Sequence, residues 1–123
     1  MGQDEFWASV IVPFFNAQDT ISDCFSSLAS QKDRPREVLM VDNASTDRSK
    51  SIVLAQIEQE KDSAFRLMSE SKKGPSAARN TAARNASGSW LLFTDSDCIV
   101  DPAWVQRFLR HAQGGRLGAI AGS

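Results

Sequence analysis

Two carboxylates, Asp95 and Asp97, follow directly after the apolar run Trp90–Thr94 in the stretch WLLFTDSDC. Carboxylates two positions apart repel each other unless water or a cation neutralises them. Mg²⁺ and similar hard cations are typically held by one or two carboxylates together with substrate phosphates. The pattern D-x-D is common by chance, and it gains force here from its place at the end of an apolar segment. The pair predicts a site for a divalent metal ion and a diphosphate.

Positive charge is concentrated in the stretch SKKGPSAARNTAARN, where Lys72 and Lys73 precede Gly74 and the sequence A-A-R-N occurs twice, five residues apart. Five residues turn a helix by about 140° beyond one revolution, so Arg79 and Arg84 should point to different faces. Arg79 lies in the earlier turns of this helix, where the positive end of the helix dipole favours anions. We therefore expect Arg79 to contact a ligand and Arg84 and Lys72 to be solvated.

Nine elements are needed to position these residues. Continuous apolar runs, which are typical of strands buried on both faces, predict strands at Ser9–Phe15, Glu37–Val41 and Trp90–Thr94. A weaker strand is expected at Ala64–Met68, and residues 117–122 can begin a fifth. Apolar periodicity and capping residues predict helices at about Ala17–Ser30, around Ile52–Ile57 after a cap at Ser45, Thr46 or Asp47, at about Pro75–Ala86, and after the cap Asp101 with Pro102 as first helical residue.

This alternation of strands and helices predicts the α/β class, as an open, mostly parallel sheet with helices on both faces. In such sheets, ligands bind beyond the carboxyl ends of the strands, near the point where the strand order reverses. If the first strand lies between the second and the fourth, Asp42 and Asp95 are two strand spacings apart, roughly 10 Å. A cleft of this width can accommodate a nucleotide.

Composition excludes several other functions. The 123 residues suffice for one domain, and 14 basic against 15 acidic residues give a net charge of −1, which argues against a nucleic-acid partner. The sequence has neither a run of about 20 apolar residues nor a signal peptide, so we expect a cytoplasmic protein. Cys24 and Cys98 are expected to be reduced, and the single histidine, His111, is expected at the surface, which excludes Ser-His-Asp catalysis. No P-loop or G-x-G-x-x-G motif is present in the sequence.

Three segments together, SVIVPFFNAQDTISDCFSSLASQ, EVLMVDNASTDRS and GPSAARNTAARNASGSWLLFTDSDC, resemble the start of family 2 glycosyltransferases in order and spacing. The resemblance covers nearly the whole chain and implies a Rossmann-like GT-A fold. It implies that Pro13, Phe15 and Asn16 belong to a first-strand motif whose aromatic residue contacts uracil. Phe15 stands where tyrosine is usual, so stacking should survive while a hydroxyl contact is lost.

The resemblance assigns further roles by position. Asp42 matches the aspartate that recognises the base, and Asn43 replaces a frequent second acid. Lys73, Gly74, Arg79 and Asn80 match the following donor-binding loop and helix. Asp95 and Asp97 match the D-x-D pair that contacts the ribose and binds Mn²⁺ or Mg²⁺ on the diphosphate.

The family places its general base, an Asp or Glu, on a later segment together with acceptor-binding residues. Residues 1–123 are therefore expected to form a single partial GT-A domain, the donor nucleotide-binding half, with the acceptor half and the general base outside it. The expected reaction is metal-dependent, inverting transfer of a sugar from a nucleoside diphosphate sugar, with uridine favoured as the base. The acceptor can be a glycan, a lipid or a protein, and the parent protein can associate with the inner face of a membrane. The isolated fragment is expected to bind its donor without efficient turnover.

Two alternatives come from other functional classes. A receiver-like signalling domain also carries acids at strand ends, but it requires an acidic pair after the first strand, where this sequence has PFFN. Labelling by acetyl phosphate would discriminate this alternative. A non-catalytic nucleotide-binding or assembly module is the other alternative, and its discriminator is whether a sugar nucleotide binds at all. An uncovered sheet edge near Ile120 and the outer face of the last helix also predict self-association.

Overall fold

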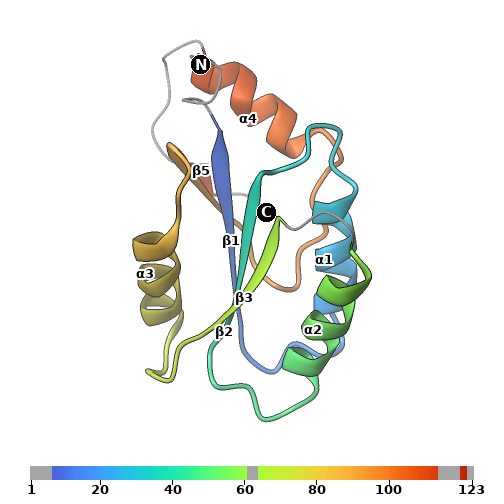
Figure 1. The fold of residues 1–123 in the computed structure, drawn as a ribbon, viewed down its shortest axis with the longest axis vertical. Helices are drawn as coiled ribbons and strands as arrows, with labels where there is room; N and C mark the ends of the chain where they lie inside the picture. Colours follow the sequence, from blue (N-terminus) through green and yellow to red (C-terminus); the bar gives the residue numbers. More distant parts are fainter. Residues whose placement is uncertain (1–6, 61–63, 114–119, 122–123) are drawn as a thin grey trace.

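A computed structural model describes residues 7–60, 64–113 and 120–121 of the chain. Strands and helices alternate along the described chain, as predicted (Figure 1). Their bounds are β1 Ala8–Phe14, α1 Ile21–Ala29, β2 Glu37–Asp42, α2 Ser49–Gln59, β3 Phe65–Ser69, α3 Pro75–Asn85, β4 Trp90–Phe93, α4 Trp104–Gln113 and β5 Ile120–Ala121.

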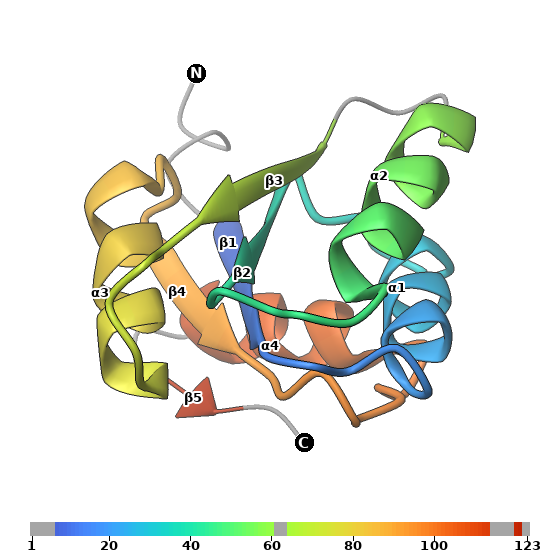
Figure 2. The same ribbon diagram turned by 90° about the horizontal axis from the view of Figure 1, so that it is seen from below.

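The five strands form one sheet in the order β3-β2-β1-β4-β5, and every neighbouring pair is parallel. The first strand lies between the second and the fourth, which confirms the order on which the predicted cleft depends. In the register of the sheet, Ile11 pairs with Leu39 on one side and with Phe93 on the other. Because the strands are parallel, their carboxyl ends share one edge, which lies at the bottom in Figure 1 and faces the viewer in Figure 2.

Side chains alternate between two cores on opposite faces of the sheet, because successive residues of a strand point to opposite sides. On one face Val10 and Val12 pack in a larger core that includes residues of α1, α2 and α4. On the other face Ile11 and Leu39 pack against Ala78 and Ala82 of α3. Figure 2 shows α3 on one side of the sheet and the other helices on the opposite side. The continuous apolar pattern of β1 is thus explained by burial on both faces.

Two expected helix starts were placed too early. The helix expected from about Ala17 begins at Ile21, and the residues before it form a turn in which the Thr20 N–H bonds to the Ala17 carbonyl. Pro102 was expected as the first residue of α4, but α4 begins at Trp104. The Pro102 carbonyl instead accepts the N–H of Lys32, which holds this residue in the preceding turn.

The two acids predicted as helix caps, Asp101 and Asp47, accept main-chain N–H groups close to the helix starts. The Asp101 carboxylate accepts the N–H of Ala103 at 2.8 Å, within the turn that leads into α4. At the start of α2, the carboxylate of Asp47 accepts the N–H of Ser49 at 2.9 Å, while Arg48 occupies the boundary position. Both acids satisfy N–H groups at helix entrances, as expected from their position.

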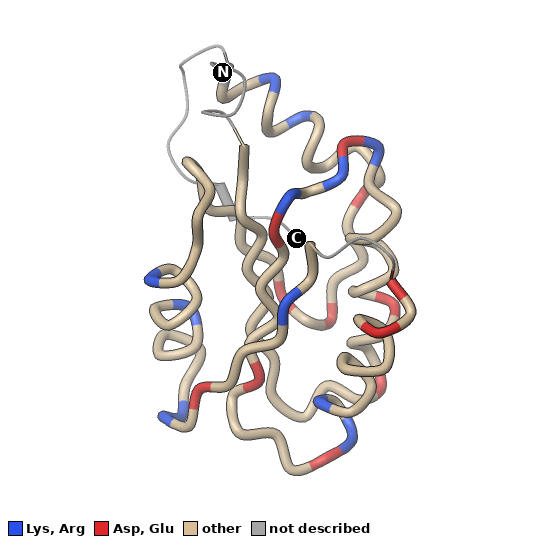
Figure 3. Tube along the Cα trace, viewed as in Figure 1, with Lys and Arg blue, Asp and Glu red and all other residues tan. Residues whose placement is uncertain are grey.

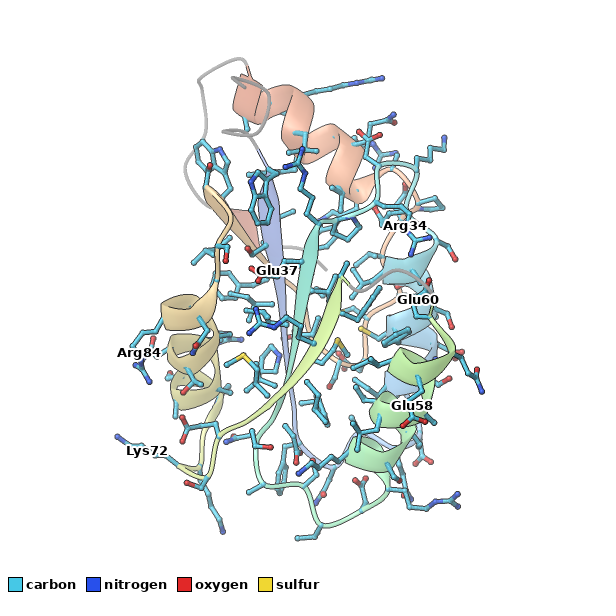
Figure 4. The ribbon with its side chains drawn as sticks, in the orientation of Figure 1. Arg34, Glu37, Glu58, Glu60, Lys72 and Arg84 are labelled. Atoms are coloured by element: carbon cyan, nitrogen blue, oxygen red, sulfur yellow. The ribbon has the colours of Figure 1, made fainter. Side chains whose placement is uncertain are left out.

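The amino-terminal edge of the sheet is closed by a buried carboxylate. Glu37, labelled in Figure 4, accepts hydrogen bonds from the Ser9 hydroxyl at 2.7 Å, the Ser87 N–H at 2.9 Å and Arg66 at 2.9 Å. Gly88 lies so close to β1 that a Cβ atom built on it would approach the Ser9 nitrogen to 2.6 Å. This edge lies opposite the predicted cleft, and its contacts stabilise the fold.

Charged residues of both signs are spread over the helices and loops in Figure 3, in keeping with the net charge of −1. His111 is exposed, as predicted. Among the described residues, no helix is long and apolar enough to cross a bilayer. The side chain of Ile120, on which the prediction of self-association partly depends, lies outside the described residues.

Candidate functional site

A pocket of about 460 Å³ opens at the carboxyl edge of the sheet, where the cleft was predicted. Its walls come from four parts of the chain that the fold brings together: the end of β1 with the loop after it, the residue after β2, the start of α3 and the turn after β4. The predicted residues that line it are Pro13, Phe15, Asn16, Arg79, Asp95 and Asp97. The pocket therefore brings together six of the residues predicted to bind the donor or the metal.

Phe15 presents an aromatic ring to this pocket. It is 55% exposed, although the preceding residue of β1, Phe14, is only 2% exposed. An exposed aromatic ring at the mouth of a pocket offers a flat apolar face on which a planar ligand can stack.

Asn16 connects the loops that follow β1 and β2. Its backbone adopts a positive φ of 49°, and its side-chain oxygen accepts the N–H groups of Thr46 at 2.8 Å and Asp47 at 3.3 Å. Its own N–H donates to the Ser45 hydroxyl at 2.9 Å. Sequence reasoning predicted Asn16 as a ligand contact and did not predict that its side-chain oxygen would bridge two loops.

Asp42 and Lys73 do not line this pocket within the described part of the chain. Asp42 is 5% exposed at the end of β2, and its carboxylate accepts the N–H of Ser45 at 3.0 Å. Lys73 is exposed in the loop before α3. Neither position is tested as a ligand contact by this geometry, and both assignments stay predictions.

The two carboxylates after β4 are both exposed and lie close together. One ligand atom each from Asp95, Asp97 and Cys98 falls within 4.8 Å of the others. Oxygen ligands of this kind suit Mg²⁺ or Mn²⁺, so the residues present fit the metal that the sequence predicted. Arg79 supplies positive charge beside them, with its Nη2 atom 3.8 Å from Oδ1 of Asp95.

The turn after β4 that carries Asp95 and Asp97 is held by a hydrogen bond from Cys24 of α1. The Cys24 thiol donates to the main-chain carbonyl of Asp95 at 3.6 Å, and the N–H of Cys98 donates to the same oxygen at 3.1 Å. Both cysteines are free thiols, as predicted. Burial, followed by the nearby Cys98 thiol and the carboxylates of Asp97 and Asp95, raises the pKa of the Cys24 thiol to about 12. Cys24 is therefore a neutral hydrogen-bond donor at neutral pH.

Asn43 is a pocket residue to which sequence reasoning gave no role. It is 6% exposed, and its side chain bonds to three main-chain groups of the loop between β3 and α3. Its position directly after the β2 aspartate was visible in the sequence, but no sequence pattern indicated its contact with a loop about 30 residues away.

The two arginines of α3 lie on different sides, as the helical spacing predicted. Arg79 lines the pocket, whereas Arg84 is exposed and its Nη2 atom donates to the Thr81 hydroxyl at 3.3 Å. Figure 4 shows Arg84 pointing away from the sheet. Lys72, also labelled there, is exposed as well.

The family model for glycosyl transferase family 2 matches residues 9–123. The chain belongs to this family. Family membership agrees with the predicted resemblance and leaves no support for the receiver-like alternative.

Three relatives illustrate the similarity of this family 2 chain. Glycosyltransferase AglE of Haloferax volcanii is 33% identical over 120 residues, which cover 95% of this chain and 39% of AglE. The crystal structure of S. aureus TarS 1-349 in complex with UDP-GlcNAc matches with a TM-score of 0.78 and 28% identity over 88% of this chain and 31% of the TarS 1-349 chain. The mannosyltransferase PcManGT from Pyrobaculum calidifontis, in complex with GDP-Man and Mn²⁺, matches with a TM-score of 0.72 and 36% identity over 78% of this chain and 29% of PcManGT.

These structural neighbours are GT-A glycosyltransferases, which confirms the predicted fold class. The family 2 chain covers between 29% and 39% of the AglE, TarS 1-349 and PcManGT chains that it matches.

Proposed function

We propose that residues 1–123 form the donor-binding part of a glycosyltransferase and bind a nucleoside diphosphate sugar together with a divalent metal ion. The observation that carries the proposal is one pocket that combines an exposed aromatic ring, an arginine and a pair of carboxylates at the carboxyl edge of the sheet. Base, phosphate and metal each require one of these groups.

Each group of pocket residues is assigned one role in donor binding. Phe15 stacks on the base, with Pro13 and Asn16 shaping the loop beside it. Arg79 binds the diphosphate, and its guanidinium can bind phosphate oxygens in a bidentate manner. Asp95 contacts the ribose and shares the metal ion with Asp97.

Asp42 and Lys73 have proposed roles that rest on the family resemblance. Asp42 is assigned to recognition of the base, and Lys73 to the diphosphate. Lys73 is exposed in the loop before α3, so its ammonium group is accessible to a bound diphosphate.

The metal ion, Mn²⁺ or Mg²⁺, would neutralise negative charge on the diphosphate leaving group when bound. Relatives with Mn²⁺ in their structures, such as PcManGT, support a divalent metal of this class. The chain's own contribution is to hold the donor so that its anomeric carbon is accessible. The acceptor oxygen then attacks this carbon with inversion, and the bond between the carbon and the diphosphate oxygen breaks, so that the nucleoside diphosphate leaves. The proton of the acceptor hydroxyl passes to a general base.

In this proposal the general base and the acceptor-binding residues lie outside residues 1–123. The acceptor class, whether glycan, lipid or protein, depends on those residues. A uridine nucleotide is the preferred donor by resemblance, and TarS with UDP-GlcNAc supports it. A guanosine nucleotide is the main competitor, given GDP-Man in PcManGT.

Calorimetric titration of the chain tests the proposal. UDP, GDP and ADP are titrated in Mn²⁺, in Mg²⁺ and in EDTA, with UDP-GlcNAc as the sugar nucleotide. We expect UDP to bind in Mn²⁺ and to bind much more weakly in EDTA. Equal binding in EDTA would remove the metal from the proposal, and absence of nucleotide binding under all conditions would remove the proposal itself.

A further inference from the structure

One buried amide, Asn43, holds the loop that leads from the edge strand β3 into α3. Its Nδ2 group donates to the carbonyl of Glu70 at 3.0 Å and to the carbonyl of Lys72 at 2.8 Å. Its Oδ1 atom accepts the N–H of Gly74 at 3.0 Å. The main-chain N–H of Asn43 is itself bonded to the Phe14 carbonyl at 2.8 Å, so the residue is anchored to β1. Both donors and the acceptor of one amide are thus used on a single loop.

This loop determines where α3 begins. Gly74 adopts a φ of 114°, a conformation that other residues rarely adopt, and Pro75 follows as the first helical residue. Proline has no N–H and cannot donate a hydrogen bond at the start of α3. The hydrogen bonds that fix this start must therefore come from neighbouring residues. The hydrogen bond from Gly74 to Asn43 fixes the residue directly before the helix. Arg79, about one turn further on, faces the pocket from this helix.

A second contact holds the same loop from the side of α3. The Thr81 hydroxyl donates to the carboxylate of Glu70, which also accepts the N–H of Lys72 at 2.8 Å. The hydrogen bond from Thr81 is the main reason why the pKa of Glu70 lies below its ordinary value. Loop and helix are therefore joined at Asn43 on the sheet side and at Thr81 on the helix side.

Asn43 meets requirements that a carboxylate at the same position would not meet. An aspartate can still accept the Gly74 N–H, but it would present an oxygen to the carbonyl oxygens of Glu70 and Lys72, where two donors are needed. Unpaired polar groups in a buried position are costly, so the loop would have to move. The two carbonyl groups and the N–H group of this loop therefore require the two donors and the acceptor of an amide side chain.

We propose that Asn43 is a positioning residue that sets the start of α3, and with it Arg79, against the diphosphate side of the nucleotide pocket. The inference rests on the proposed nucleotide site for its functional part. Asn43 acts on the ligand through the loop and through Arg79. The predicted consequence of its loss is a weaker contact with the diphosphate and an unchanged contact with the base.

The test compares Asn43→Asp and Asn43→Ala with Asn85→Asp, which makes the same change of charge near the exposed end of α3. Asn85 bonds to the Thr81 carbonyl at 2.8 Å and does not line the pocket. Hydrogen exchange of the free chain is measured first. We expect the Gly74 N–H to lose protection most strongly in Asn43→Ala, because its acceptor is removed, while Asn85→Asp retains the protection of the original chain.

Binding is then measured with UDP and with uridine, which lacks the diphosphate, in Mn²⁺. We expect each Asn43 variant to weaken UDP binding roughly tenfold, the effect of misplacing about one charged hydrogen bond. Binding of uridine should change less than threefold, and Asn85→Asp should bind both ligands normally. Equal losses for UDP and uridine would show a merely structural role and overturn the inference.

A further variant covers the case in which the Asn43 variants do not fold. Thr81→Val keeps the shape of the side chain but removes the hydroxyl that bonds to Glu70. It loosens the same loop from the helix side, and we expect the same selective loss for UDP. If the original chain binds UDP and the folded variants bind it equally well, the inference fails while the proposed function stands. If the original chain binds no nucleotide, the proposed function fails.

Discussion

Replacing Arg79 with alanine should weaken nucleotide binding and strengthen metal binding at the same time. Nη2 of Arg79 is 3.8 Å from Oδ1 of Asp95, and the side chains are 43% and 66% exposed. An ion pair this exposed contributes about 0–1 kcal/mol to stability, so Arg79→Ala should fold and melt much like the original chain. Its effects should therefore appear in binding.

The size of each effect follows from the exposure of the groups. A hydrogen bond to a charged group contributes about 1.5–3 kcal/mol, and the half-exposed position of Arg79 argues for the lower end. UDP binding should thus weaken roughly tenfold, which corresponds to about 1.4 kcal/mol. Two unit charges about 4 Å apart in water interact by about 1 kcal/mol, so removal of the arginine should strengthen Mn²⁺ binding to Asp95 and Asp97 up to about fivefold.

Arg84→Ala is the matched control, because Arg84 occupies the second A-A-R-N sequence and contacts the Thr81 hydroxyl on the exposed side of α3. Calorimetry measures UDP binding at saturating Mn²⁺, and a separate titration measures Mn²⁺ binding without nucleotide. Arg84→Ala should change neither value by more than about twofold, as expected for an exposed surface residue. Equal losses of UDP affinity in the two variants, or weaker Mn²⁺ binding in Arg79→Ala, would refute the reasoning.

Three further outcomes follow from the structure. Asp97→Asn should retain the fold but bind UDP equally in Mn²⁺ and in EDTA, and a metal-dependent difference that persists would argue against its role as a ligand. Because the pKa of the Cys24 thiol is raised from 9.0 to about 12, its contribution to stability is fully present below pH 9 and is lost as the pH rises towards 12. The free energy of unfolding in urea, measured at pH 8 and at pH 10.5, should therefore change less in Cys24→Ala than in the original chain. The chain has no tyrosine that would titrate in this range. Gly88→Ala should destabilise the chain by about 2 kcal/mol, because a Cβ atom would collide with the main chain at Ser9. A melting temperature equal to that of the original chain would show that the segment at Gly88 can move away from β1 without cost.

Much of the site could be predicted because its chemistry lies at strand ends. The apolar runs identified β1, β2 and β4, and polar residues directly after them had to lie at one edge once the strands were parallel. Helical spacing alone also separated Arg79 from Arg84. These inferences rest on local periodicity, which the sequence contains in full.

The tertiary structure decided how the loops between these elements are held. The sequence could not show that the Asn16 side chain bridges to the loop after β2, or that the Cys24 thiol supports the Asp95 carbonyl from a distant helix. Nor could it show that Asn43 uses its whole amide on the loop before α3. Each of these contacts joins residues about 30 to 70 positions apart, and a hydrogen bond between a side chain and a distant main-chain group leaves no periodic pattern. The sequence by itself determined which residues could reach the pocket edge, while the folded loops decided which of them line the pocket and which hold the others in place.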